Sequence, residues 1–302
     1  MKKAVTLVLA ALLVFSLAAC GGGTSSSSSA AAGSTPASTP ESTPASTPDS
    51  TVSISDEAPG GDDTATTLVL GTSADYPPFE FHILDGGEDK IVGFEVGLAY
   101  EIAADQNAEL QIVDMNFDNL LSLLAKGDCD FVIAAMEATD ERLEAATASD
   151  PYYTDLPAMM LVKKENLDNY ATFSDFDGKT VGAQSGTTKA DLIPETMPGA
   201  TPLLMASVVD LVNNLVYDKC DALVLDGAVA LQYAAANEEL AVIEAPELAL
   251  GDALPYSVWV ALGDPKGLLP AINDTIARVL EDGTMDTLIA DADALSSQAL
   301  EG

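Results

Sequence analysis

Apolar residues repeat twice in the same order along this chain, first at helical spacing and then as an unbroken strand-like run. In the first copy the helical spacing covers residues 117–124 and the apolar run covers residues 131–136. In the second copy the spacing covers residues 208–215 and the run covers residues 222–225. A helix followed by a buried strand, repeated at equal spacing, predicts two related βαβ units with parallel strands.

Four further segments extend this pattern. Residues 67–71 are predicted to form the first strand, and residues 179–183 to open a second sheet. The apolar positions within residues 96–103 share one face of a predicted helix. Residues 268–281 predict an amphipathic helix that Gly283 can end. We therefore expect residues 68–302 to fold as two α/β lobes.

The first twenty residues have the pattern of an export signal. A short positive start precedes residues 4–19, which are uncharged and mostly apolar but shorter than the ~20 residues that a membrane span needs. The small residues before Cys20 resemble a bacterial lipobox, in which the cysteine is acylated and becomes the new N-terminus. We predict that residues 1–20 are a lipoprotein signal peptide, with an uncleaved membrane anchor as the alternative.

Residues 21–67 form a low-complexity segment with a four-residue Ser-Thr-Pro repeat that begins at Ser34. Such a segment cannot bury enough apolar area to offset the entropy of ordering it. We predict a disordered tether, which at ~3.1 Å per residue could reach about 140 Å. Sugar attachment to its Ser and Thr residues stays open.

Acidic residues outnumber basic residues by 48 to 12, which gives a formal net charge of −36. No basic stripe exists that could displace counterions from nucleic acid, so nucleic acid is excluded as a partner. The acidity favours solubility outside the cell and says little about a ligand.

Cysteine and histidine are too rare for several kinds of site. Beyond Cys20 the cysteines are Cys129 and Cys220, each at the entry of a predicted buried strand, where a small apolar residue fits. Two cysteines do not make a disulfide framework. The lone His82, which we expect at a strand edge or in a loop, leaves no histidine-based metal site and no Ser-His-Asp triad. We expect neither a metal nor a cofactor.

Only two of the basic residues are arginines, and they differ in their surroundings. Arg278 has Asp274 four residues before it and Asp282 four residues after it, which predicts an exposed ion pair on a helix. Arg142 follows the apolar run of residues 131–136, near the end of a predicted buried strand. Its planar guanidinium could grip a ligand carboxylate with two hydrogen bonds, which a lysine cannot do.

Several segments, in this order, resemble the extracellular solute-binding proteins of ABC importers for polar amino acids. The matching segments are residues 71–81, 92–96, 134–142, 149–153, 178–188, 221–226 and 255–256. The resemblance implies the type II periplasmic-binding-protein-like fold, in which two lobes, each a mostly parallel sheet with flanking helices, are joined by two hinge strands. It places lobe I at residues 68–151 and 256–302, lobe II at 157–250, and the hinges at 152–156 and 251–255.

The charged ends of a free amino acid would each need a partner in a buried site. Arg142 can bind the carboxylate, while residues 186–188 can add backbone N–H groups and a hydroxyl at a helix N-terminus. Asp226, at the end of a predicted strand, can bind the ammonium together with the carbonyl of Ala135. The resemblance places Arg142, Gly186, Thr187, Thr188, Asp226 and Ala135 in these same roles. Thr187 and Thr188 could instead only cap a helix, and Asp226 could end its strand in solvent.

The resemblance adds three residues around the ligand side chain. Tyr76 and Phe94 are implied to be aromatic walls, although both could be ordinary core aromatics. Gln184 resembles a side-chain reader in the second lobe.

Two positions depart from the family pattern. Glu137 stands where relatives hold Ser or Thr, and a glutamate beside a ligand carboxylate would repel it unless it accepts from an ammonium. We expect Glu137 and Asp226 to approach the ligand ammonium together, so either the ligand carries a second positive group or Glu137 is protonated. Ser73 replaces an aspartate of many lysine- and arginine-binding relatives, which argues against the first case. The identity of the amino acid stays open.

The resemblance implies a monomeric binding protein, not an enzyme, held by a lipid on Cys20 at the outer face of the bacterial cell membrane. It would deliver an amino acid to an ABC permease. Three alternatives remain: a cyclohexadienyl-type dehydratase with Glu137 as general acid, a ligand-sensing subunit, and an adhesive lipoprotein.

Overall fold

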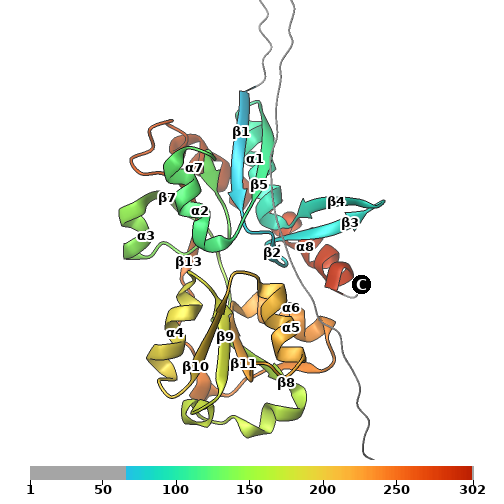
Figure 1. The fold of residues 1–302 in the computed structure, drawn as a ribbon. Helices are drawn as coiled ribbons and strands as arrows, with labels where there is room; N and C mark the ends of the chain where they lie inside the picture. Colours follow the sequence, from blue (N-terminus) through green and yellow to red (C-terminus); the bar gives the residue numbers. More distant parts are fainter. Residues whose placement is uncertain (1–65, 301–302) are drawn as a thin grey trace, which may run out of the picture. The chain divides into compact units, whose positions relative to one another are not determined.

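The computed structural model describes residues 66–300, which form two lobes (Figure 1). Lobe I is built on a five-stranded sheet, and lobe II on a second one. The first sheet has the order β5 (Ala108–Asp114), β1 (Thr66–Thr72), β6 (Phe131–Val132), β13 (Pro255–Ala261) and β7 (Ala146–Thr154). The second has the order β10 (Thr201–Met205), β9 (Thr180–Gln184), β11 (Ala222–Leu225), β8 (Met159–Lys163) and β12 (Leu240–Val242).

The strand pairing confirms the two predicted βαβ units. In lobe I, β1 is parallel to both β5 and β6, and in lobe II, β9 is parallel to both β10 and β11. The remaining pairs within these two sheets are antiparallel and involve β7, β8, β12 and β13. Each lobe is therefore a mixed sheet. The predicted strands β1 and β6, and β9 and β11, are parallel pairs, whereas the parallel edge strands β5 and β10 were not predicted.

Helices flank both sheets. Those of lobe I are α1 (Phe94–Asp105), α2 (Leu120–Lys126), α3 (Asp140–Ala145), α7 (Leu269–Glu281) and α8 (Thr284–Leu300), with the 3-10 turn η1 (Phe117–Asn119). Those of lobe II are α4 (Thr188–Thr196), α5 (Val208–Val216) and α6 (Gly227–Ala236), with η2 (Lys164–Asn169), η3 (Phe173–Phe176) and η4 (Pro246–Leu248). A small sheet of β2 (Asp75–Tyr76), β3 (Glu80–Asp85) and β4 (Glu88–Val92) extends from lobe I (Figure 1).

The helical spacing of apolar residues agrees with burial. On α5 the four predicted positions are all buried: Val208, Leu211, Val212 and Leu215. Burying such a side chain fully contributes about 1.5–3 kcal/mol, so this face fixes the helix on its sheet. The predicted helix of residues 268–281 is α7, and Gly283 follows it with a φ of 80°.

Both cysteines are buried free thiols at the entry of β6 and β11, as expected. Cys129 lies directly behind Gly71 of β1. A Cβ added to Gly71 would come within 3.2 Å of both the Cys129 sulfur and a Val132 methyl carbon. The first strand therefore needs glycine here because helix α2 and β6 pack so closely against it.

Two expectations need correction. The strand predicted over residues 131–136 ends at Val132, because the chain leaves the sheet and Ala135 adopts a left-handed φ of 46°. The ion pairs of Arg278 join it to Asp282, Glu101 and Asp105, and not to Asp274, because α1 packs beside α7 and supplies two carboxylates. The exposed His82 lies on β3, as predicted.

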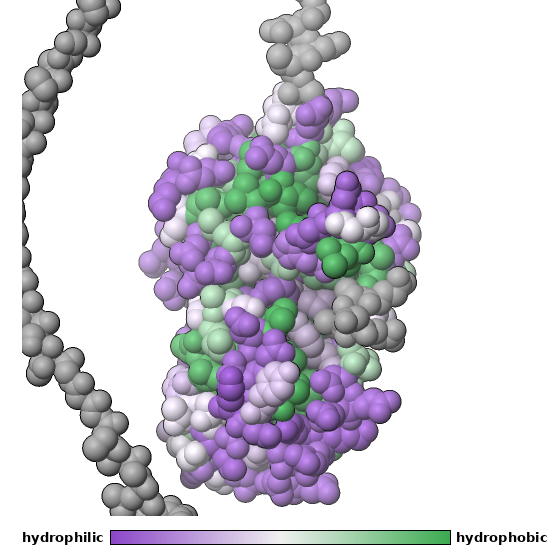
Figure 2. All heavy atoms as spheres, turned by 45° about the vertical axis from the view of Figure 1, so that its right-hand side comes forward, coloured by the Kyte–Doolittle hydropathy of each residue, from purple (hydrophilic) through white to green (hydrophobic). Residues whose placement is uncertain are grey.

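Hydrophilic residues cover much of the face shown in Figure 2, with apolar residues gathered in smaller areas. Among residues 66–300 there is no helix with both the length and the apolar character that a membrane crossing requires. The predicted signal peptide, the acylated Cys20 and most of the predicted tether lie outside the described residues.

Candidate functional site

Three charged side chains meet where the two lobes face each other. The ammonium of Lys189 contacts the carboxylate of Glu137 and lies 2.5 Å from Oδ1 of Asp226. Glu137 belongs to lobe I, whereas Lys189 and Asp226 belong to lobe II. All three side chains are less than a tenth exposed, so water screens their charges only weakly.

The local sequence explains how each group reaches this place. Asp226 directly follows the buried strand β11 and precedes the first turn of α6. Lys189 lies in the first turn of α4, whose N-terminus Thr187 caps by accepting a hydrogen bond from the N–H of Ala190. Glu137 forms an isolated bridge with Tyr256 of β13. The ends of two strands and one helix therefore converge on a single point, as ligand sites in α/β proteins do.

Arg142 forms part of the same network, on α3. Its Nη1 donates to the Glu137 backbone oxygen at 3.0 Å and to Oε2 of Glu137 at 2.9 Å. Its Nη2 donates to the carbonyl of Gly186 across the lobes, at 3.1 Å. The guanidinium carbon also lies 5.3 Å from the centre of the Phe117 ring. The fork that was predicted for a ligand carboxylate thus has Glu137 as its partner.

Two more hydrogen bonds join the lobes around this network. The hydroxyl of Tyr76 donates to Oδ2 of Asp226 at 2.6 Å. The hydroxyl of Thr188 donates to Oε1 of Glu137 at 2.8 Å. The two lobes are therefore held together here by polar side chains.

The cavity at this point is small, with a volume of about 10 Å³, which is room for about one water molecule. It is lined by Ser73, Tyr76, Glu80, Phe117, Ala134, Ala135, Glu137, Gln184, Thr187, Lys189 and Asp226. A wider cleft of about 600 Å³ adjoins it, and the predicted residues Arg142, Gly186 and Thr188 line that cleft.

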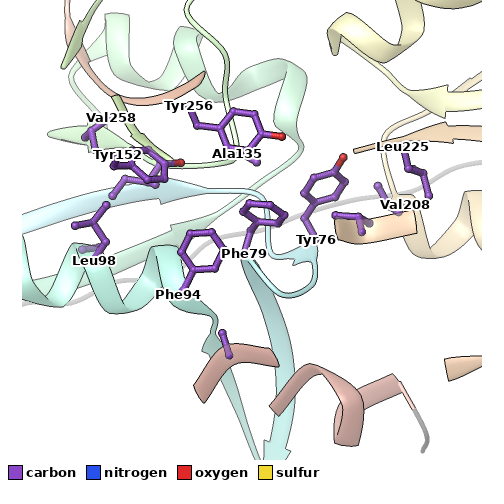
Figure 3. Packing of buried hydrophobic residues seen from close by; sticks show 14 of the residues in the cluster. Tyr76, Phe79, Phe94, Leu98, Ala135, Tyr152, Val208, Leu225, Tyr256 and Val258 are labelled. Atoms are coloured by element: carbon purple, nitrogen blue, oxygen red, sulfur yellow. The ribbon is translucent and has the colours of Figure 1, made fainter. Parts of the chain in front are cut away.

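The predicted site residues therefore divide into three groups. Six line the small cavity: Tyr76, Ala135, Glu137, Gln184, Thr187 and Asp226. Arg142, Gly186 and Thr188 line the wider cleft, which Thr187 borders as well. Phe94 lines neither the cavity nor the cleft, and its ring packs against Phe79, with 4.8 Å between the ring centres. Figure 3 shows Phe79 between Tyr76 and Phe94.

Gln184 is already engaged by protein groups. Its Nε2 donates to the carbonyl of Ala206 at 3.0 Å and to Oδ1 of Asp75 at 3.3 Å. Asp75 also accepts from the N–H of Val208 at 2.7 Å, which ties lobe I to the start of α5. Burial raises the pKa of Asp75 to about 6.

The electrostatics of the network keep Glu137 ionised. Burial alone would raise the pKa of Glu137, but Lys189 and Arg142 together lower it to about 2. Burial would lower the pKa of Lys189, and the carboxylates of Asp226 and Glu137 raise it instead. Two cations, Arg142 and Lys189, thus balance two carboxylates, and a protonated Glu137 does not fit this arrangement.

A second pair of acids lies behind Ala135. Both oxygens of Glu95 accept from the N–H of Ala135 at 3.0 Å, and Glu95 also accepts from the hydroxyl of Tyr152. Glu80 is buried beside it and lines the cavity, and its Oε2 has no hydrogen-bond partner among the described residues. Burial and the neighbouring Glu95 raise the pKa of Glu80 well above its usual range, and burial raises that of Glu95.

Sequence reasoning missed Lys189, Glu80 and Glu95. Glu80 and Glu95 were inside matched segments, but no pattern singled out their side chains. Lys189 directly follows Thr187 and Thr188. Its partner Glu137 lies 52 residues earlier in the chain, and its partner Asp226 directly follows strand β11. The available signal was charge balance, because two predicted acids at one site called for a second cation.

The geometry can be compared with known proteins. Residues 68–291 match the bacterial extracellular solute-binding proteins, family 3. This chain belongs to that family. The two lobes of this solute-binding protein are those of the type II periplasmic-binding-protein fold, in agreement with the sequence-based prediction.

The relatives of this solute-binding protein are named as binding proteins. The probable histidine-binding protein of Campylobacter jejuni is 33% identical over 230 residues, which cover 75% of this chain and 85% of the relative. The substrate-binding protein AbpA of Streptococcus pneumoniae, solved with L-arginine, is 30% identical, with a TM-score of 0.72. The match covers 76% of this chain and 95% of AbpA. An ancestral amino-acid-binding protein, a precursor of cyclohexadienyl dehydratase, is also 30% identical, with a TM-score of 0.66. The match covers 74% of this chain and 94% of the ancestral protein.

Proposed function

We propose that this protein captures a free amino acid between its lobes and delivers it to an ABC import permease. The observation that carries the proposal is that Glu137 and Lys189 link Arg142 of lobe I to Asp226 of lobe II in one buried ion-pair network between the lobes. A cation and an anion at the two ends of such a network suit the carboxylate and the ammonium of one amino acid. The relatives named for histidine and solved with L-arginine support this class of ligand.

In this proposal Arg142 binds the ligand carboxylate, with help from the hydroxyls and N–H groups of residues 186–188. Asp226 and the carbonyl of Ala135 bind the ammonium. Tyr76 forms a wall of the site, and Gln184 borders the ligand side chain from lobe II. Phe94 acts through Phe79, which it supports.

Capture requires the lobes to open and close. The ends of β7 and β13 are paired where the chain crosses between lobes, with Thr154 opposite Pro255. Two short crossings side by side suit a hinge. We place the hinges at residues 152–156 and 251–255, with lobe I at 68–151 and 256–302 and lobe II at 157–250.

We further propose that the protein acts as a monomer at the outer face of the cell membrane, anchored by a lipid on Cys20 and a tether of residues 21–67. The dehydratase alternative is weakened by Glu137, because a carboxyl group whose pKa is about 2 holds no proton to donate at neutral pH. No observation among the described residues favours the sensing or adhesive alternatives.

A thermal-shift screen of the purified protein against the twenty amino acids tests the ligand class. A ligand present at 100 times its dissociation constant should stabilise the protein by about 2.7 kcal/mol. Cells that lack the protein should also take up that amino acid more slowly. The proposed function fails if no amino acid changes the melting temperature.

A further inference from the structure

Resting on the proposed function, we infer that Lys189 is a built-in counter-ion that the ligand displaces, and that it restricts the ligand to amino acids without a charged side chain. The Lys189 ammonium already sits on Asp226, the acid proposed for the ligand ammonium. It lies 5.8 Å from the centre of the Tyr256 ring of lobe I and is almost fully buried. Lys189 therefore holds the position that a ligand cation would take.

Glu137 plays the matching part for the ligand carboxylate, since it occupies Nη1 of Arg142. The remaining cavity of about 10 Å³ cannot hold an amino acid beside these groups. A ligand that enters must replace Glu137 at Arg142 and Lys189 at Asp226. Glu137 and Lys189 can then remain paired with each other, as they already are.

This exchange leaves no buried charge alone. Each ion pair that breaks is replaced by one of the same kind, and the displaced acid and lysine keep their mutual contact. Keeping every charge paired is important because a buried charge without a partner is strongly destabilising. A zwitterion with no further charge therefore fits a network whose cations and anions are already equal in number.

A cationic side chain on the ligand would add a third positive charge to Arg142 and Lys189. Glu80 borders the cavity with an oxygen that has no hydrogen-bond partner within residues 66–300, but burial beside Glu95 favours its neutral, protonated form. A neutral carboxyl group can donate to or accept from an amide or a hydroxyl. The side chain that suits this cavity is therefore polar and uncharged, as in glutamine.

Titration calorimetry with glutamine and arginine tests the restriction. The parent protein should bind glutamine at least tenfold more tightly than arginine. Lys189→Met should shift the ratio of the two affinities toward arginine by at least tenfold, because the guanidinium of the arginine ligand can then pair with Glu137. Lys179→Met is the matched control, since Lys179 is a partly exposed lysine of lobe II paired with Asp221, and it should keep the parent's ratio. Equal or tighter binding of arginine by the parent, or an unchanged ratio in Lys189→Met, overturns the inference.

A second measurement needs no ligand. Without Lys189 the carboxylates of Glu137 and Asp226 would face each other across the lobes and repel. Spin labels at Leu262→Cys in lobe I and Tyr217→Cys in lobe II, both exposed positions, report the separation of the lobes. The separation should increase in Lys189→Met and return toward the parent value when Asp226→Asn is added.

The two measurements separate the inference from the proposed function. An unchanged separation in Lys189→Met overturns the role of Lys189 even if amino acids bind. If the separation increases but none of the twenty amino acids binds, the proposed function and the ligand restriction fail, while Lys189 is supported as the counter-ion that joins the lobes.

Discussion

The hydroxyl of Tyr76 donates to the Asp226 carboxylate across the two lobes, with 2.6 Å between the oxygens. Tyr76 comes from the small sheet of lobe I, and Asp226 from the end of β11 in lobe II. Asp226 therefore receives one hydrogen bond from each lobe, since Lys189 of α4 contacts its other oxygen. The acid proposed for the ligand ammonium is oriented by two separate elements.

Tyr76→Phe should weaken amino acid binding by about tenfold to a hundredfold, because a hydrogen bond to a charged group contributes about 1.5–3 kcal/mol. Titration calorimetry measures this directly. Tyr100→Phe is the control, since Tyr100 is more than half exposed, and its affinity should match the parent. Parent-like affinity in Tyr76→Phe would show that this hydroxyl does not orient the acid for the ligand.

Arg142→Lys should nearly abolish ligand binding. The ammonium of a lysine cannot bind the carboxylate that replaces Glu137 with the two parallel hydrogen bonds that the planar fork allows. Calorimetric titration of the variant gives the answer, with Arg278→Lys as a control because Arg278 is partly exposed and far along the chain. Unchanged affinity in Arg142→Lys would remove Arg142 from the carboxylate role.

Glu137→Gln should lower stability near neutral pH by about 3 kcal/mol, an order of magnitude taken from a pKa near 2 against the usual 4.5. A carboxylate with a depressed pKa stabilises the folded state above its unfolded pKa and loses that effect as the pH falls. The parent should therefore lose stability between about pH 4.5 and pH 2, and the variant should lose less over that window.

Urea unfolding at a series of pH values checks this difference, with Glu141→Gln as the control because Glu141 is exposed on the neighbouring helix. If the free energy of unfolding varies with pH in the same way in the parent and in Glu137→Gln, Lys189 and Arg142 do not lower the pKa of Glu137.

Cys20→Ala should release the protein from the membrane, because the thiol that would carry the lipid is gone. Cell fractionation followed by immunoblotting measures the share in the membrane pellet. Cys129→Ala serves as the control, since its thiol is buried in lobe I, and it should stay with the membranes. Retention of Cys20→Ala in the pellet would contradict lipid anchoring at this residue.

The sequence predicted those parts of the fold that local patterns determine. Apolar spacing located α5 and α7 because their buried faces repeat with the helical period. It overestimated the strand after Phe131, because the left-handed turn at Ala135 is made by an alanine, and only a glycine or asparagine would have signalled it. Local patterns also could not predict that α1 packs beside α7, and this packing gives Arg278 its partners on α1.

The candidate site was predictable only in part, for the same reason. Arg142 and Asp226 stood out because each follows a buried strand and carries a charge that a ligand needs. Lys189 did not, because its two partners come from distant segments and only the fold brings them together. The puzzle of two acids for one ammonium was visible in the sequence, but its answer depended on tertiary contacts.

The hydrogen bonds from Ala135 to Glu95 affect how much order is lost or gained when a ligand arrives. Glu95 belongs to the buried face of α1, so it fixes the chain at Ala135 to a rigid helix. The left-handed conformation costs about 1–3 kcal/mol in an alanine, and the folding of lobe I offsets that strain before any ligand binds. Lobe I therefore presents a rigid surface, and most of the entropy that binding removes should come from the hinge and from the side chain of Lys189.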